Sequence, residues 1–143
     1  MDLIAHFRGA RTTLHLESGL TLFSEGEPGD QMYVLLEGTA AVCVAGAVVE
    51  VAEPGALLGE MSVVDSSRRS ATVITRSKCR VISINKHQFD LLVRESPEFA
   101  RHVMSVMANR LRRMNEGFAE ALSELPDRGK RFLDALGQGR TAG

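Results

Sequence analysis

The sequence predicts an α+β fold, an antiparallel β-sandwich or jelly-roll barrel followed by helices. From about residue 12 to residue 84, short apolar runs alternate with glycine, proline and acidic turn residues, a pattern typical of antiparallel β-structure. After Ile84 the apolar residues recur at spacings of three and four, the period of an α-helix. A chain of 143 residues can bury a core without disulfides or metals, so we expect one main domain, residues 1–125, and a short extension.

The expected strands are the apolar runs between turn signals. Dipeptides such as Glu37-Gly38 and Ala45-Gly46 supply the glycine that tight hairpins need. We therefore expect strands at residues 12–16, 21–23, 31–37, 39–45, 47–52, 71–75 and 79–84.

Residues 55–73 are the most unusual stretch, because they are too long for a hairpin turn and too apolar for a loose loop. We expect a helical turn from Glu60 to Val64, and a helix that starts after a glycine exposes N–H groups suited to a phosphate. Arg69 follows nine residues after Glu60. Its fork of donors suits a cyclic phosphate, whereas the Glu60 carboxylate suits a ribose hydroxyl. Taken alone, these residues favour the ordinary alternative, an exposed ion pair between Glu60 and Arg69.

Two helices are expected after the strands. Asn85 can cap a first helix over residues 86–94, and Ser96-Pro97-Glu98 combines a capping serine, a proline at the first helical position and an acid in the first turn. The second helix, residues 97–125, carries a long apolar seam that either packs on the chain's own β-domain or pairs with a second copy. Its length favours a homodimer. The members of the seam are Ala100, Val103, Met107, Leu111, Met114, Phe118, Ala121 and Leu125.

The last residues, 126–143, predict a short helical extension and then a flexible tail, since the end is rich in glycine. Arg128, Lys130 and Arg131 form a small basic cluster. We interpret this cluster as a solvated helix start, with a partner-binding role as the alternative.

Composition excludes several classes of function. The net charge is −1, with 17 basic and 18 acidic residues, so no overall field attracts nucleic acid or an anionic membrane. Cys43 and Cys79 lie in apolar runs and are expected to be buried free thiols in a reducing compartment. Neither a signal sequence nor a membrane span is evident, which predicts a cytoplasmic protein. The histidines are scattered without the close spacing of metal ligands, so we expect no metal site. We also expect no other cofactor and no enzyme activity, because no catalytic machinery is evident in the sequence.

Two motifs resemble a known family. Residues 25–38, from Glu25-Gly26 to Glu37-Gly38, are similar to the glycine-punctuated strand and turn of the cyclic-nucleotide-binding domain. This family includes bacterial catabolite activators, cyclic-nucleotide-dependent kinases and gated channels. Residues 59–62 and 69–73 resemble the family's phosphate-binding cassette, with its glutamate and arginine nine residues apart. The resemblance covers roughly residues 14–125. We call residues 59–73 the cassette.

The resemblance implies a role for each residue of the cassette that matches the family pattern. It implies that Glu60 binds the ribose 2′-hydroxyl and that Arg69 binds the cyclic phosphate. A phenylalanine often precedes the Gly-Glu pair in relatives, whereas Leu58 stands here, a change expected to alter packing more than ligand choice. The remaining cassette residues implied to lie around the ligand are Gly59, Ser70 and Ala71 at the phosphate, Met61 and Val73 at the base, and Ser62 as a further ligand-binding residue.

The second helix is implied to bring residues over the base. By position the candidates are Arg110, Met114 and Asn115, with a solvated helix face as the alternative for the arginine. Catabolite activators carry small hydroxyl residues where Met114 and Asn115 stand here, so their adenine contact is not reproduced. Ser70 is placed to contact a guanine 2-amino group, so the choice between adenine and guanine stays open.

The leading hypothesis is a ligand-gated regulatory module that binds cAMP in preference to cGMP and acts through an effector protein. Only about eighteen residues follow Leu125, too few for a helix-turn-helix, so we expect no direct DNA binding. We also expect no membrane contact, since the sequence shows no span and no overall positive charge. The alternatives are a degenerate domain that only dimerises or docks, and a β-barrel metalloenzyme. Ligand titration discriminates the first, and metal analysis discriminates the second.

Overall fold

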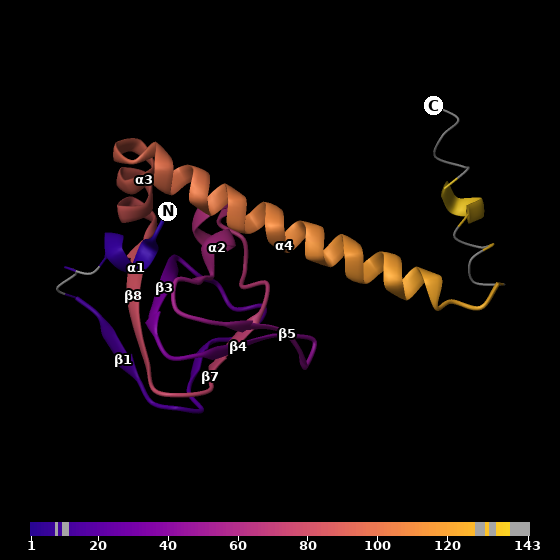
Figure 1. Cartoon of the computed structure of the whole chain (residues 1–143), viewed down its shortest axis with the longest axis horizontal. Coiled ribbons are helices and arrows are strands. Elements are labelled where there is room, and N and C mark those ends of the chain that lie inside the picture. The colour runs from indigo at the N-terminus through magenta and orange to yellow at the C-terminus, as the bar shows by residue number, and fades with distance from the viewer. Residues whose placement is uncertain (8, 10–11, 128–130, 132–133, 138–143) are drawn as a thin grey trace. The chain divides into compact units, whose positions relative to one another are not determined.

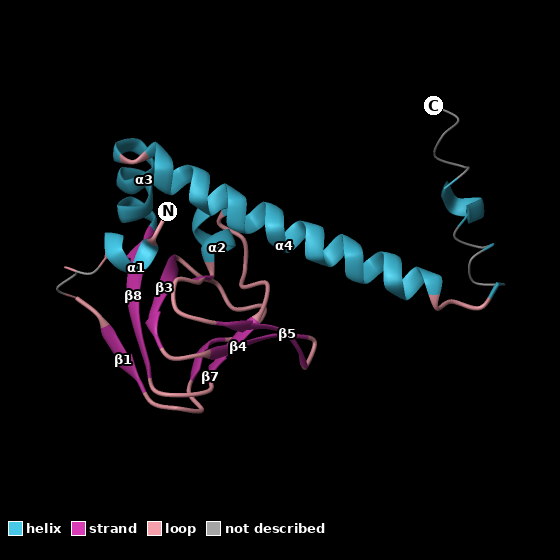
Figure 2. Cartoon of the chain, viewed as in Figure 1, coloured by secondary structure: helices cyan, strands magenta, loops and turns pink. Residues whose placement is uncertain are grey.

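The computed structural model describes residues 1–7, 9, 12–127, 131 and 134–137, which form two antiparallel sheets and several helices (Figures 1 and 2). The chain divides into two compact units, Met1–Val103 and Met104–Gly143. The first unit holds both sheets, and the second holds most of the last long helix. The predicted fold class is confirmed as an open sandwich of two four-stranded sheets.

The first sheet has the strand order β1-β8-β3-β6, and the second has the order β2-β7-β4-β5. Neighbouring strands are antiparallel throughout. The bounds of the first sheet are β1 (Leu14–Leu16), β8 (Cys79–Asn85), β3 (Gln31–Glu37) and β6 (Leu57–Leu58), and those of the second are β2 (Thr21–Phe23), β7 (Thr72–Thr75), β4 (Ala40–Val44) and β5 (Ala47–Ala52).

The expected strands are present, and the differences lie at their ends. β1 begins at Leu14 rather than at residue 12. β6 was not expected, because two residues are too few to show a strand period. The turn between β4 and β5 is confirmed at Ala45 and Gly46, which both have positive φ, 51° and 80°, as the hairpin twist requires.

The core between the two sheets is apolar, and the strands β3 and β8 are also buried on their other face. Met32 and Val34 of β3 lie beside Ile84 and Ile82 of β8, and all four side chains are buried. A strand buried on both faces has an almost continuous apolar sequence, which is what residues 31–36 show. The core between the sheets consists of Phe23, Leu35, Ala40, Ala52, Leu58, Val73, Cys79 and Val81.

Both cysteines are free thiols, but they differ in burial. Cys79 belongs to the core between the sheets, as expected. Cys43 is only partly buried, so the expectation of two buried thiols was wrong for this residue. The reason is its place on β4 just before the exposed hairpin turn.

Four helices are described, and the caps expected for two of them are confirmed. Asn85 caps α3 (Lys86–Glu95) through a complete capping box with Gln88. The Ser96 hydroxyl accepts a hydrogen bond from the Phe99 backbone N–H at 3.2 Å, at the start of α4 (Pro97–Ser123). A short helix, α1 (Leu3–His6), was not expected, and α2 (Glu60–Asp65) is the helical turn predicted in the cassette.

The first turns of α4 are fixed by aromatic packing in the first unit. Phe99 is fully buried, and its ring centroid lies 6.0 Å from that of Phe89 on α3 and 6.5 Å from that of Phe7. Aromatic rings at these separations attract each other edge to face. Val103, one turn later, is also buried.

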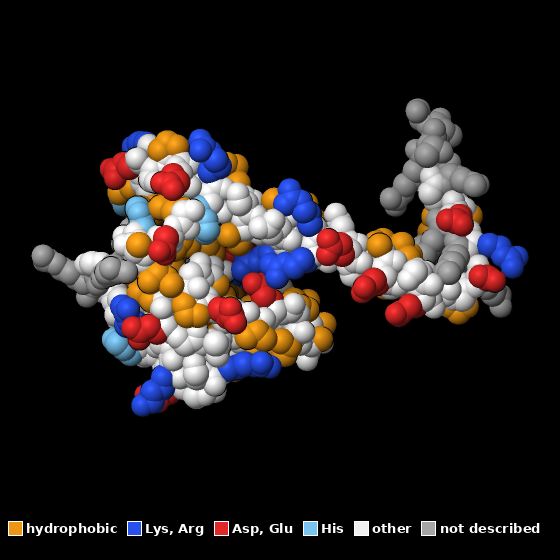
Figure 3. Space-filling view, in the orientation of Figure 1, with side chains coloured by type: hydrophobic (Ala, Val, Ile, Leu, Met, Phe, Trp, Pro, Cys, Tyr) orange, Lys and Arg blue, Asp and Glu red, His pale blue; other side chains and the backbone are white. Residues whose placement is uncertain are grey.

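Farther along α4 the seam is exposed. The seam residues Leu111, Met114 and Phe118 each have more than half of their surface exposed, as does Met104 outside the seam, and Figure 3 shows apolar side chains along this helix. In the extension, residues 127, 131 and 134–137 are helical. Arg128, Lys130 and the expected tail at 138–143 lie outside the described residues.

No helix in the described part of the chain is both long enough and apolar enough to cross a membrane. Within the same residues, no three or more His, Cys, Asp or Glu side chains gather as they would around a metal ion.

Candidate functional site

The cassette begins where the chain leaves β6 and enters α2. Gly59 is the N-cap of α2 and has a φ of 74°, a left-handed conformation that glycine adopts without strain. Glu60 is therefore the first residue of the helix, and α2 packs on β3. The Glu60 side chain is only 2% exposed, which is rare for a glutamate.

Arg69 lies beside the start of α2. Its side chain is 6% exposed, and its Nη1 donates a hydrogen bond to the Gly59 carbonyl oxygen at 3.2 Å. The structure therefore brings Arg69 next to Gly59, the residue before Glu60. Since Glu60 and Arg69 are both buried, the alternative of an exposed surface pair is wrong.

Aromatic rings flank the Arg69 guanidinium. Its Cζ lies 4.2 Å from the ring centroid of Phe23 and 6.0 Å from that of Tyr33. The two rings are nearly parallel, at 19°, with their centroids 6.1 Å apart. A cation within about 6 Å of an aromatic face is attracted by the ring's electrons, and more strongly when water is excluded.

Two glycines make room for the same guanidinium. A Cβ atom at Gly29 would overlap Nε and Cζ of Arg69, and a Cβ atom at Gly59 would overlap Nη1. We call Phe23, Gly29 and Gly59 the arginine cradle. Any side chain at either glycine would displace the guanidinium from this position.

The backbone of Arg69 is held by the loop between β2 and β3. The Gly26 N–H donates to the Arg69 carbonyl at 2.9 Å, and the Arg69 N–H donates to the Glu27 carbonyl at 2.8 Å. Arg68 also donates from Nη1 to the Gly26 carbonyl, at 3.0 Å. These hydrogen bonds fasten the glycine-rich motif at residues 25–38 to the cassette.

The other predicted site residues differ in exposure. Ser62, Ala71 and Val73 are buried, whereas Met61 and Ser70 are exposed. Val73 faces the core between the sheets. Arg110 and Asn115 lie on α4 in the second compact unit. Their contact with a nucleotide base stays a prediction.

Three residues of the site were missed by sequence reasoning. Gly29 and Tyr33 fall inside the motif at residues 25–38 but received no role of their own. Phe23 precedes that motif, and nothing in its neighbours indicates an arginine 46 positions later. No local signal identifies any of the three, because Pro28-Gly29 has the composition of an ordinary turn.

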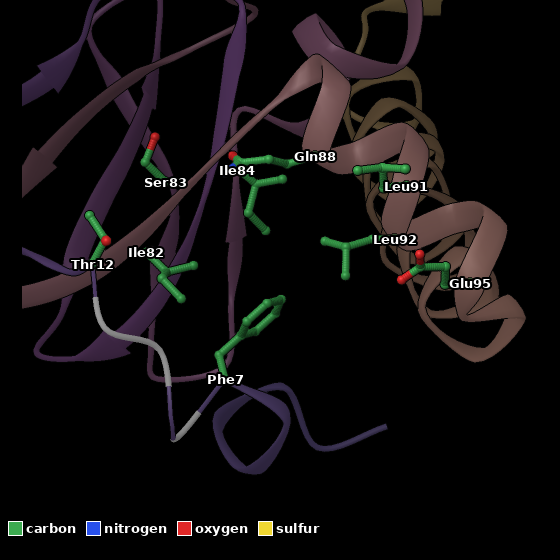
Figure 4. Close-up of a pocket in the computed structure, with 9 residues that line it drawn as sticks. All are labelled: Phe7, Thr12, Ile82, Ser83, Ile84, Gln88, Leu91, Leu92 and Glu95. Atoms are coloured by element: carbon green, nitrogen blue, oxygen red, sulfur yellow. The ribbon is translucent and has the colours of Figure 1, made fainter.

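A separate cavity of about 380 Å³ lies between β8 and α3 (Figure 4). The side chains of Phe7, Ile84 and Leu92 converge on it, and Glu95 lies at one side. None of its lining residues belongs to the cassette or to the arginine cradle.

Residues 13–96 match the family described as the cyclic nucleotide-binding domain. The chain belongs to this family. The match includes both sheets and the entire cassette. The resemblance carried by residues 25–38 and 59–73 is thereby confirmed at the level of the family.

Two curated relatives illustrate what the family contains. The chain is 28% identical over 126 residues to a CRP-like cAMP-activated global transcriptional regulator of Mycobacterium tuberculosis, covering 84% of this chain and 56% of that protein. It is 36% identical over 83 residues to a cyclic nucleotide-gated potassium channel of Mesorhizobium japonicum, covering 58% of this chain and 23% of the channel. The chain thus spans about half the length, or less, of these relatives.

Solved structures of the family share the sandwich. The catabolite activator protein of Thermus thermophilus matches with a TM-score of 0.70 at 23% identity, over 77% of this chain and 54% of that one. The N-terminal domain of a transcriptional regulator from Streptomyces coelicolor matches with a TM-score of 0.58 at 30% identity, over 79% of this chain and 82% of that one. The fold of the cyclic nucleotide-binding domain is therefore present here.

Proposed function

We propose that this chain binds a cyclic nucleotide, with cAMP favoured over cGMP, and acts as a ligand-gated regulatory module that signals to a protein partner. The observation that carries the proposal is the burial of two charged side chains, Glu60 at the start of α2 and Arg69, which is hydrogen-bonded to the preceding Gly59. Charged side chains are seldom buried unless they are paired or serve a site. Here both lie in the segment that matches the family's cassette.

The two side chains have complementary tasks in this proposal. Arg69 offers a planar set of five N–H donors, of which the hydrogen bond to Gly59 uses one, and it binds the singly charged cyclic phosphate. Glu60 can only accept hydrogen bonds, so it binds the ribose 2′-hydroxyl. Because the surroundings exclude water, hydrogen bonds to these charges are stronger than on the surface.

The small residues of the cassette let the ligand approach the backbone. We assign Gly59, Ser62, Ser70 and Ala71 to the neighbourhood of the phosphate, while the base meets Met61 and Val73 from the β-domain. Arg110 and Asn115 of α4 are proposed to close over the base. The preference for cAMP is supported by the name of the Mycobacterium tuberculosis relative, a cAMP-activated regulator.

Gating is proposed to run through α4, with the nucleotide-binding domain reaching about residue 125. Met104, Leu111, Met114 and Phe118 are exposed at heptad-like spacing, which suits pairing with the same helix of a second copy. A ligand shifts such a helix only by binding one arrangement more tightly than another. We propose that the module is a homodimer. We also propose that it has no enzyme activity and acts on an effector protein.

Calorimetric titration of the pure protein with cAMP and with cGMP tests the function. We expect saturable binding to at least cAMP, and a loss of roughly 2 to 5 kcal/mol in the Arg69→Ala variant, since a buried charge pair loses one member. Arg76→Ala is the matched control, because Arg76 is exposed just after β7 and lies outside the cassette. Absence of binding to either nucleotide at millimolar concentration refutes the proposal.

A second candidate is a domain that docks or dimerises without any nucleotide. It is favoured by one observation: the Arg69 guanidinium already has a hydrogen bond to Gly59 and a ring contact with Phe23 within the protein. This candidate predicts the same oligomeric state with no response to ligand. The titration above separates the two.

A further inference from the structure

The ring of Phe23 is the nearest aromatic surface to the Arg69 guanidinium. The 4.2 Å separation is well inside the range of a cation–π contact, and Phe23 is itself buried in the core between the sheets. Tyr33 lies beside Phe23, with its ring centroid 6.0 Å from the Arg69 Cζ, and extends the aromatic surface. The contact is therefore shielded from water, which strengthens it.

The cradle restricts the guanidinium from several directions. The Arg69 Cζ lies over the Phe23 ring, and the bare backbones of Gly29 and Gly59 leave the space that the guanidinium occupies. An arginine side chain has many rotamers, so holding it in place before a ligand arrives lowers the entropic cost of binding.

We propose that Phe23 is the positioning residue for Arg69, and that Gly29 provides the space which this position requires. The inference rests on the proposed function, because Arg69 is the group that binds the cyclic phosphate. Phe23 touches no ligand in this proposal. It acts by keeping the guanidinium beside Gly59 and Glu60, where the phosphate is bound.

The test uses two pairs of variants in the full chain, with affinity for cAMP measured by calorimetry. Phe23→Leu removes the ring, and Phe89→Leu removes a buried ring of the same size on α3, outside residues 59–73. Gly29→Ala pushes the guanidinium aside, and Gly117→Ala adds a methyl group that meets nothing within 4 Å. We expect about tenfold weaker binding for Phe23→Leu and Gly29→Ala, and wild-type affinity for both controls.

Gly29→Ala provides an independent test of the position of Arg69 if Phe23→Leu does not fold. The three atoms nearest to its new methyl group are Nε, Cζ and Nη2 of the flexible Arg69 side chain, and its backbone does not have the left-handed φ that strains alanine. We expect this variant to fold and to lose no more stability than the contact between Phe23 and Arg69 contributes. Wild-type affinity in Gly29→Ala would overturn the proposal.

A double-mutant cycle on the ligand-free protein distinguishes positioning from simple packing. Unfolding is measured for the wild type, Phe23→Leu, Arg69→Gln and the double variant. We expect the effects on the unfolding equilibrium to be non-additive by about threefold to tenfold, because each single change removes the same contact. Additive effects would overturn the inference even if Phe23→Leu binds weakly. If the wild type binds no nucleotide, the proposed function fails; if it binds and Phe23→Leu binds equally well, only this inference fails.

Discussion

Glu60 is a nearly fully buried carboxylate at the first position of a helix. Acidic side chains are favoured at helix N-termini by the helix dipole, and that position alone explains an exposed glutamate. It does not explain the burial, because removing a carboxylate from water is costly. In the proposed function, a hydrogen bond from the ribose 2′-hydroxyl to this carboxylate offsets part of that cost.

The role of Glu60 can be measured with two ligands. We expect Glu60→Gln to lower the affinity for cAMP by about 10- to 100-fold, the value of a hydrogen bond to a charged group. We expect the wild type to prefer cAMP over 2′-deoxy-cAMP and the variant to bind both alike. Calorimetry with the two nucleotides measures this.

Glu53→Gln is the control for this experiment, since it removes one carboxylate from an exposed turn just before the cassette. It should bind as the wild type does. If Glu60→Gln still discriminates between the two nucleotides, Glu60 does not contact the ribose.

At the scale of elements, the first turns of α4 are held in the first unit and include a histidine. Burial lowers the pKa of His102 below its ordinary value of 6.5, and the positive amino group of Met1 adds to the effect, while Glu98 opposes it. Its Nε2 is buried and has no hydrogen-bond partner among the described residues. The folded protein therefore favours the neutral imidazole.

This shift predicts how stability depends on pH. Because the pKa is lower in the folded state than in the unfolded state, the contribution of His102 is complete above about pH 6.5 and is lost as the pH falls through the folded-state pKa. We expect the free energy of unfolding in urea to fall between pH 8 and pH 5.5, and to fall less in His102→Gln. An exposed control, His87→Gln, should keep the wild-type dependence. An unchanged dependence in His102→Gln would contradict the prediction.

The starts of α3 and α4 could be predicted from the sequence, because a helix cap is a hydrogen bond between residues that are close together in the chain. Asn85 and Ser96 each satisfy backbone N–H groups within the next three residues, so their sequence neighbours were sufficient to locate α3 and α4. α1 has the same kind of cap, at Asp2, but only four residues follow it, too few for a helical period. The short strand β6 was missed for the same reason.

At the scale of the whole molecule, the seam of α4 has two different parts. Val103 is buried in the first unit, whereas Leu111, Met114 and Phe118 are exposed in the second. The buried part is packed within the chain itself, whereas pairing of the exposed part with a second copy stays a prediction. A row of exposed large apolar residues on one helix indicates an interface.

The homodimer is tested by breaking that row. We expect the wild type to sediment as a dimer and the Leu111→Glu/Phe118→Glu variant as a monomer, because two buried carboxylates cannot be accommodated in an apolar seam. Glu116→Lys, which lies on the same helix between Met114 and Phe118 but off the seam, should remain dimeric. Analytical ultracentrifugation measures all three, and a monomeric wild type at micromolar concentration contradicts the prediction.

The sequence by itself determined the strands, the helix caps and the position of the cassette, because each depends on the periodicity, turn chemistry or motif of neighbouring residues. Only the tertiary structure decided what surrounds Arg69. β2 pairs with β7, which places Phe23 opposite Val73 and so near the residues just before β7. Pairing between distant strands depends on the packing of the whole sandwich, and no local pattern around Phe23 or Gly29 reports it.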